Sequence, residues 1–182
     1  GAEALVRYQL DENLILAPNA FIPLLEETQT ISQIDFFVFE FVCLRLQKWI
    51  REGRPISPVS VNFSRYTVLE ETFCQRLAEL SDHYQISRDL LEIEITENAL
   101  DVREEDLRKT IDAVRRSGFS VSIDDFGVEF SNLSLFSGAD FDILKLDRSL
   151  IQDIAVNEKA QALIQAMSDV CLKMKIKLVV VE

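Results

Sequence analysis

This sequence predicts an α/β fold with a parallel sheet. Short β-branched or alternating runs recur along the chain, and stretches with helical periodicity lie between them. Parallel neighbours need a crossover connection, which is usually a helix, so this alternation favours a parallel sheet covered by helices. A (β/α) barrel and an open, doubly wound sheet both fit the pattern. The sequence contains no Gly-rich phosphate loop of the dinucleotide or P-loop kind, which removes the usual doubly wound nucleotide binders.

Five strands and three long helices follow from the apolar pattern. The predicted strands are residues 59–62, 91–96, 120–124, 143–146 and 177–181. Apolar stripes at steps of three and four residues comprise Phe39, Val42, Cys43, Leu46 and Trp49, then Leu107, Ile111 and Val114, then Leu163, Met167, Val170, Cys171 and Met174. We interpret these stripes as packing faces of helices and not as cofactor sites. Gly118 is predicted to end the second helix before the strand at Ser120, and residues 17–23 to form a loop that enters a short helix.

Composition limits the class of protein. The 182 residues are 48% hydrophobic, which is enough for one globular core, so we expect a single domain over residues 1–182. No apolar run approaches the roughly 20 residues that span a bilayer, so we expect this domain to make no membrane contact. Cys43, Cys74 and Cys171 are predicted to be buried free thiols of a reducing compartment. We therefore expect a cytoplasmic location, including the cytoplasmic part of a larger membrane-anchored protein.

The net charge of −12 argues against a polymeric nucleic-acid partner, because such binding depends on Lys and Arg neutralising phosphates. Acidity does not exclude a small anionic substrate. A group of carboxylates can hold divalent cations, and the cations can then hold phosphate.

Oxygen-bearing side chains lie at or just after the ends of several predicted strands. They are Asn62, Glu94, Glu97, Asp124, Asp125 and Glu182. In a parallel barrel these strand ends converge on one face, which is where barrel enzymes place catalytic groups. A single acid at a strand end is more often a solvated loop residue or a helix cap. Their recurrence on successive strands favours a functional site.

Asp124 and Asp125 form the sharpest pair, because adjacent carboxylates repel each other and gain from a bound cation or a nearby ammonium group. The structural alternative is an Asp-containing turn before Gly127. Lys145 lies within residues 141–146, where strand alternation would direct it to the same interior as the acids. A solvated lysine at a sheet edge is the alternative.

His83 is the chain's one histidine and is predicted to lie on the surface, so the candidate metal ligands are oxygen atoms. Oxygen ligands favour Mg²⁺ or Mn²⁺ over zinc. Carboxylates that share two cations suit in-line hydrolysis of a phosphodiester. Lys145 would orient the attacking water or stabilise developing charge.

Six motifs in order carry a resemblance to the EAL domain family. They are Glu3-Ala4-Leu5 with Arg7, Phe21-Ile22-Pro23-Leu24, Val61-Asn62-Phe63-Ser64, Glu92-Ile93-Glu94-Ile95-Thr96-Glu97, Asp124-Asp125-Phe126-Gly127 and Leu144-Lys145-Leu146-Asp147-Arg148-Ser149. The tripeptide alone would mean nothing, whereas six ordered motifs across the whole chain argue strongly against chance. The resemblance implies a modified TIM (β/α) barrel that hydrolyses cyclic di-GMP to linear pGpG in bacterial second-messenger signalling.

The resemblance also implies a role for each matching residue. A first metal would be bound by Glu3, Asn62, Glu94 and Asp124, and a second by Asp124, Asp125 and Glu182. Leu5 and Arg7 would contact the substrate, Arg7 through a phosphate. Lys145 and Glu182 would be catalytic, with Lys145 at the nucleophilic water. Glu97 would hold the loop after the Asp-Asp strand and would not bind metal.

Two departures from the family pattern affect these expectations. Active members usually read Asp-Asp-Phe-Gly-Thr-Gly-Tyr-Ser-Ser, whereas here Val128 and Glu129 replace the Thr and the second Gly. The altered loop leaves open a catalytically impaired domain that acts as a cyclic-di-GMP receptor or regulatory module. A pure protein-interaction module is a third reading, and the retained acids argue against it.

The second departure is length, since we expect an incomplete barrel that lacks the family's first and last strands. The family often forms homodimers near the loop after Asp125. The resemblance therefore implies homodimer formation, and we also expect fusion to other signalling domains.

Overall fold

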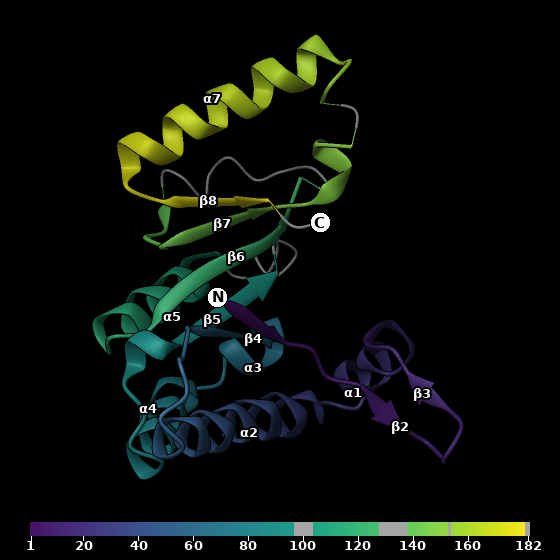
Figure 1. Cartoon of the computed structure of the whole chain (residues 1–182), viewed down its shortest axis with the longest axis vertical. Helices are drawn as coiled ribbons and strands as arrows, with labels where there is room; N and C mark the ends of the chain where they lie inside the picture. Colours follow the sequence, from purple (N-terminus) through teal and green to yellow (C-terminus); the bar gives the residue numbers. More distant parts are fainter. Residues whose placement is uncertain (97–103, 128–137, 153, 181–182) are drawn as a thin grey trace.

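Among the described residues, the main sheet of this protein has six strands, all parallel to their neighbours. The computed structural model describes residues 1–96, 104–127, 138–152 and 154–180. Along the sheet the strands are β1 (Ala2–Ala4), β4 (Val59–Phe63), β5 (Leu91–Thr96), β6 (Ser120–Phe126), β7 (Ile143–Leu146) and β8 (Lys177–Val180), as Figure 1 shows. A separate antiparallel pair consists of β2 (Tyr8–Gln9) and β3 (Ile15–Leu16). The arrangement is an incomplete TIM-like barrel, which confirms the predicted fold class.

Helices connect the parallel strands and cover the sheet. They are α1 (Ile22–Glu27), α2 (Ile31–Arg51), α3 (Arg65–Val68), α4 (Phe73–His83), α5 (Glu104–Arg116) and α7 (Glu158–Met174), with short 3-10 turns η1 (Pro18–Ala20), η2 (Arg88–Leu90) and η4 (Arg148–Leu150). Helix α2 packs on β4, α5 on β6 and α7 on β8. In Figure 1, α2 and α4 lie together at one end of the sheet and α7 lies at the other.

Strand alternation separates an apolar face of the sheet from a polar one. Val61, Ile93 and Val121 are fully buried and are register neighbours across β4, β5 and β6. Phe63 continues this face, and its ring contacts Phe73 at 5.1 Å between centroids. Alternate residues along each strand point to opposite faces, so the residues between these apolar ones point the other way, into the barrel interior.

All five predicted strands are present, with ends within two residues of the prediction where the structure describes them. Strand β1 was not predicted, because three residues with two alanines carry no strand signal; it forms by pairing with β4. Gly118 follows α5 with a φ of 95°, as expected for a glycine helix stop. His83 is exposed at the end of α4, as predicted.

The predicted packing stripes differ in burial. On α2 the stripe is buried except for Trp49, which is partly buried. On α7 only Met167 and Cys171 are buried, while Leu163 is 50% exposed and Val170 is 40% exposed. Helix α7 covers β8, an edge strand of the described sheet, so one side of the helix has no second strand to cover.

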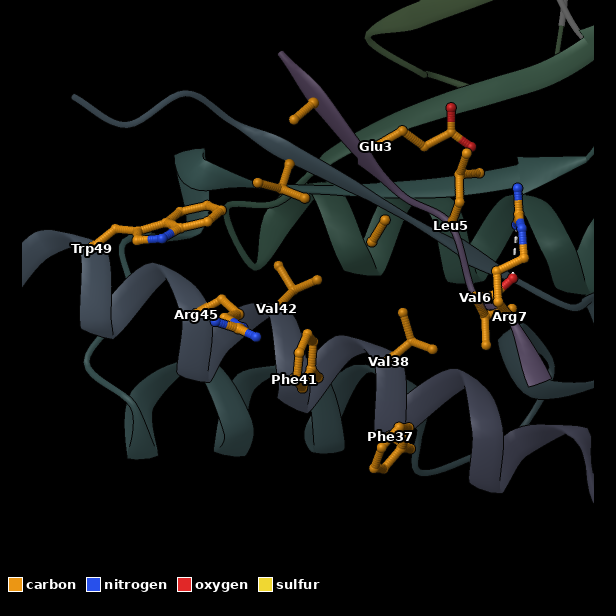
Figure 2. A pocket seen from close by; sticks show the side chains of 13 residues that line it. Glu3, Leu5, Val6, Arg7, Phe37, Val38, Phe41, Val42, Arg45 and Trp49 are labelled. Atoms are coloured by element: carbon orange, nitrogen blue, oxygen red, sulfur yellow. Dashed lines mark hydrogen bonds between the residues drawn. The ribbon is translucent and has the colours of Figure 1, made fainter. Parts of the chain in front are cut away.

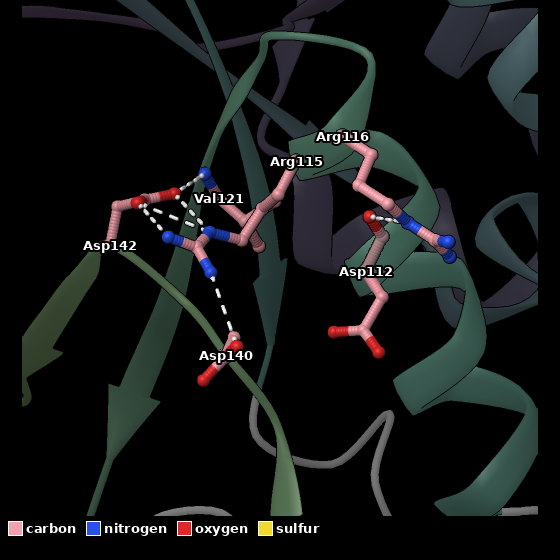
Figure 3. Close-up of polar contacts among 6 residues, drawn as sticks. All are labelled: Asp112, Arg115, Arg116, Val121, Asp140 and Asp142. Carbon is pink, nitrogen blue, oxygen red and sulfur yellow. Dashed lines mark hydrogen bonds and ion pairs between the residues drawn. The ribbon is translucent and has the colours of Figure 1, made fainter.

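An ion-pair cluster at the opposite end of the strands from the predicted acids joins α5 to β6 and β7. Arg115 contacts Asp142 with Nη2–Oδ1 at 2.8 Å and also lies 3.7 Å from Asp140 (Figure 3). The Asp142 carboxylate accepts a hydrogen bond from the backbone N–H of Val121 at 2.9 Å. These contacts fix the start of β6 against the segment that leads into β7.

The three cysteines are free thiols; Cys43 and Cys171 are buried, while Cys74 is partly buried. Burial raises the pKa of Cys43 to about 12, so that thiol stays uncharged. Within the described ranges, no helix combines the length and the apolar character needed to cross a bilayer.

Candidate functional site

Polar side chains from several neighbouring strands meet on the interior face of the sheet. Asn62 of β4 is the register partner of Glu94 of β5, and Glu94 is the partner of Ser122 of β6. Glu94 and Ser122 are fully buried, although both carry polar atoms. Burying a carboxylate is costly unless it is paired or binds a cation, so this interior requires a positive partner.

Three of the predicted acids come together in an acidic cluster, defined here as Glu3, Glu94 and Asp124. One carboxylate oxygen from each lies within 4.8 Å of the others. They come from three strands, β1, β5 and β6, that are distant in sequence. Asn62 joins the cluster through its Nδ2, which donates a hydrogen bond to Glu3 Oε1 at 2.9 Å.

Lys145 supplies a positive charge to this cluster from β7. Its Nζ lies 2.5 Å from Glu94 Oε1 and 3.7 Å from Glu3 Oε2. The residue is only 7% exposed, so the alternative of a solvated edge lysine is wrong. Burial favours the neutral amine, but the carboxylates of Glu94, Asp124 and Glu3 outweigh it and raise the pKa of Lys145. The lysine therefore remains an ammonium ion.

One lysine does not neutralise the cluster. Burial, and then the adjacent Asp124 carboxylate, raise the pKa of Glu94 above its usual range, while Lys145 opposes that rise. Glu94 Oε2 is buried and accepts no hydrogen bond from any described residue. A buried, orphaned carboxylate oxygen beside two further carboxylates fits a divalent cation with oxygen ligands. The described residues that could hold such a cation are Glu3, Asn62, Glu94 and Asp124.

Asp125 lies beside the cluster in an unusual backbone conformation. Its φ is 56°, a left-handed value that is uncommon for residues other than glycine and that often marks functional segments. Partial burial, and then the charges of Asp124, Asp147 and Glu3, raise the pKa of Asp125. Asp147 belongs to one of the six motifs, but no role was predicted for it. The position of Asp147 just after β7 could have indicated a role at this site. Its carboxylate also accepts a hydrogen bond from the Ser149 N–H at 2.8 Å.

Leu5 and Arg7, the predicted substrate contacts, follow β1 and are both exposed. They line a groove of about 380 Å³ between β1 and α2, together with Phe37, Phe41 and other residues of α2 (Figure 2). The Arg7 guanidinium donates a hydrogen bond to the backbone oxygen of Val6 at 2.8 Å. In the described part of the chain, no ion pair joins Arg7 to the acidic cluster, so its substrate role stays a prediction.

Four residues of the sequence analysis lie outside the described residues. These are Glu97, Glu182, Val128 and Glu129. The predicted second metal, the loop-holding role of Glu97 and the effect of the altered loop therefore stay predictions.

Comparison with known proteins decides the family. The family profile described as EAL domain matches residues 1–181. The chain belongs to the EAL domain family. This confirms the resemblance drawn from the six motifs.

Several relatives of this EAL domain have described functions. The chain is 28% identical to "Probable cyclic di-GMP phosphodiesterase PdeB" of Escherichia coli, over 96% of this chain and 33% of the relative. It is 30% identical to "Cyclic di-GMP phosphodiesterase NbdA" of Pseudomonas aeruginosa, over 97% of this chain and 23% of the relative. The chain thus spans a third or less of the length of these curated relatives.

A solved structure supports the same relationship. The structure described as "PaMucR Phosphodiesterase, c-di-GMP complex" superposes with a TM-score of 0.87 at 25% identity, covering 99% of this chain and 74% of that one. The fold of this EAL domain is therefore the fold of a protein solved with cyclic di-GMP.

This EAL domain also contains a buried acid that the sequence pattern does not mark. Asp35 of α2 is 6% exposed. Its Oδ2 accepts hydrogen bonds from the Ser64 backbone N–H at 2.9 Å and from Thr67 Oγ1 at 2.5 Å. Burial raises the pKa of Asp35 to about 6; the two hydrogen bonds oppose the rise, and Glu26 and Glu70 add to it.

The stability of this EAL domain should therefore depend on the ionisation of Asp35. Its folded pKa of about 6 lies above the usual 3.8, so folding favours the protonated form. The contribution of Asp35 to the free energy of unfolding is fully present below pH 3.8. It decreases by about 3 kcal/mol in all as the pH rises past about 6. In Asp35→Asn this loss is absent. Between pH 4 and pH 7, the free energy of unfolding of the variant, measured with urea, should therefore increase relative to that of the wild type by about that amount. Parallel stability curves for the two proteins would contradict this.

Proposed function

We propose that this EAL domain is a metal-dependent phosphodiesterase that hydrolyses cyclic di-GMP to linear pGpG. The observation that carries the proposal is the buried Glu94, with one oxygen on Lys145 and the other orphaned beside Glu3 and Asp124. This arrangement is suited to a cation and an anionic substrate. The named relatives and the solved complex supply the substrate class.

The cation site would use Glu3, Asn62, Glu94 and Asp124, and a second cation would use Asp124, Asp125 and Glu182. Bound Mg²⁺ or Mn²⁺ would neutralise phosphate charge and make water a better nucleophile at neutral pH. Asp125 is exposed, so its carboxylate is accessible to a second ion.

Lys145 would act directly on the reacting atoms. Its ammonium group is held by Glu94 at 2.5 Å, so its position is fixed before the substrate arrives. Being only 7% exposed, it acts in an environment where charge is weakly screened. Lys145 would donate a hydrogen bond to the attacking water and stabilise the negative charge that develops on the phosphate oxygens. Arg7 would bind a phosphate of the substrate from the groove side.

Turnover of cyclic di-GMP tests the proposal. The purified protein with Mg²⁺ or Mn²⁺ is expected to give pGpG, measured by chromatography, and Glu3→Ala should lower the rate by at least about 100-fold because it removes a cation ligand. Glu105→Ala is the matched control, because Glu105 is an exposed acid of α5 that forms an ion pair with Lys109 on the surface. Its rate should equal that of the wild type.

Two outcomes would contradict the proposal. Calorimetric binding of cyclic di-GMP without product would assign the receptor function instead. The absence of both binding and product would leave a protein-interaction role.

A further inference from the structure

We propose that Asp35 is a positioning residue, which fixes the chain where it leaves β4 and thereby holds Asn62 in place for the cation site. The inference rests on the proposed function in so far as that site binds metal. Asp35 itself belongs to α2 and makes its described hydrogen bonds outside the acidic cluster.

The geometry begins at the end of β4. Asn62 is the last interior-facing residue of that strand, and Ser64 is the first residue after it. The Ser64 N–H donates to Asp35 Oδ2 at 2.9 Å, which fixes the backbone two residues beyond Asn62. Thr67 Oγ1 donates to the same oxygen at 2.5 Å, so one buried carboxylate holds both ends of the turn that starts α3.

Phe63 transmits this constraint to Asn62. It is 2% exposed, and its ring lies 5.7 Å from Phe36 and 5.9 Å from Phe39 of the same helix α2. The side chains of Phe63 and Asn62 point to opposite faces, so holding Phe63 on the helix directs Asn62 inward. A turn that is free to move would let β4 rotate at its end and separate Asn62 Nδ2 from Glu3 Oε1, now 2.9 Å apart.

Asp35 is the hydrogen-bond acceptor of the Ser64 backbone N–H. The hydroxyl group of Ser64 is engaged in other hydrogen bonds. It donates to Glu26 Oε1 at 2.6 Å and accepts from the Tyr66 N–H at 3.4 Å, as the cap of α3. With Asp35→Ala, the Ser64 N–H and the buried Thr67 hydroxyl would both lose their acceptor. With Asp35→Asn, the amide oxygen can still accept both hydrogen bonds. Comparing the two substitutions therefore distinguishes the effect of losing the hydrogen bonds from the effect of losing the negative charge.

Asp142 provides a matched control. Its carboxylate also accepts a backbone N–H, from Val121 at 2.9 Å, and a side-chain donor, Arg115 (Figure 3). It lies before β7, at the end of the sheet away from Asn62. Asp142→Ala therefore removes a comparable set of bonds without touching the end of β4.

The first experiment needs no metal. In ¹⁵N-labelled, metal-free protein, the Asn62 side-chain amide signals, assigned with Asn62→Asp, should be separated by the hydrogen bond to Glu3. We expect them to move to the positions of a free amide in Asp35→Ala, and to stay in place in Asp35→Asn and Asp142→Ala. Unchanged signals in a folded Asp35→Ala would overturn the proposal, as would an equal shift in Asp142→Ala.

The second experiment measures Mn²⁺ binding by calorimetry on the same variants. The dissociation constant should rise about tenfold in Asp35→Ala and change less than threefold in Asp35→Asn and Asp142→Ala. Equal affinities for wild type and Asp35→Ala would overturn the role in the cation site. Wild-type protein that binds no Mn²⁺ would refute the proposed function and the cation-site role, while the amide signals would still decide whether Asp35 positions Asn62.

Discussion

Replacing Lys145 with methionine is expected to lower the free energy of unfolding of the metal-free protein by about 3 kcal/mol and turnover by about 1,000-fold. The stability loss arises because Glu94, which is fully buried, loses the ammonium group 2.5 Å from its Oε1. The loss of turnover follows because the methionine thioether cannot donate a hydrogen bond to water or phosphate. Urea unfolding and the pGpG assay measure the two effects.

Metal should distinguish the two effects of this substitution. Saturating Mn²⁺ is expected to restore much of the stability of Lys145→Met, because the cation can replace the lost positive charge, but not its turnover. Lys109→Met is the matched control, since Lys109 lies 2.8 Å from Glu105 on the surface of α5. That variant should show no measurable change in stability or turnover. A Lys145→Met protein as stable as the wild type without metal would refute the burial argument.

Replacing Glu94 with glutamine is expected to abolish the stabilisation that Mn²⁺ gives the wild-type protein and to reduce turnover to background. Stabilisation by a ligand at 100 times its dissociation constant is about 2.7 kcal/mol, so thermal unfolding with and without Mn²⁺ can detect its loss. Glutamine keeps the shape of the side chain but removes the negative charge from the centre of the acidic cluster.

Glu92→Gln is the control for this substitution, because Glu92 lies two residues earlier on the same strand. It removes one negative charge from the same face, and Mn²⁺ should still stabilise it as it does the wild type. A Glu94→Gln protein that Mn²⁺ still stabilises in full would place the cation elsewhere.

Local pattern was sufficient to predict most of the sheet. In β5, alternation alone separates Glu92 and Glu94 from Ile93 and Ile95, and the structure buries both isoleucines completely. The same reasoning predicted that Lys145 points inward, and its ion pairs with Glu94 and Glu3 confirm that orientation. These features depend on a periodicity of two residues, which the sequence displays directly.

The features that were missed depend on contacts between distant residues. Strand β1 exists because it pairs with β4, some 57 residues further along the chain, as the register of Ala2 with Val59 shows. Asp35 has the sequence environment of an ordinary helical residue, and its partners Ser64 and Thr67 are 29 and 32 residues away. No local pattern marks such a residue.

The division of the sheet into an apolar and a polar face limits how the length of this chain can vary. Inserting or deleting one residue inside β5 would turn Glu94 toward the helices and bring an isoleucine into the acidic cluster. The same change in a connection on the surface, such as the one between β2 and β3, would leave every strand in register. Changes in length that preserve this site are therefore confined to the connections. Within a strand, inserting or deleting even one residue would disrupt the acidic cluster.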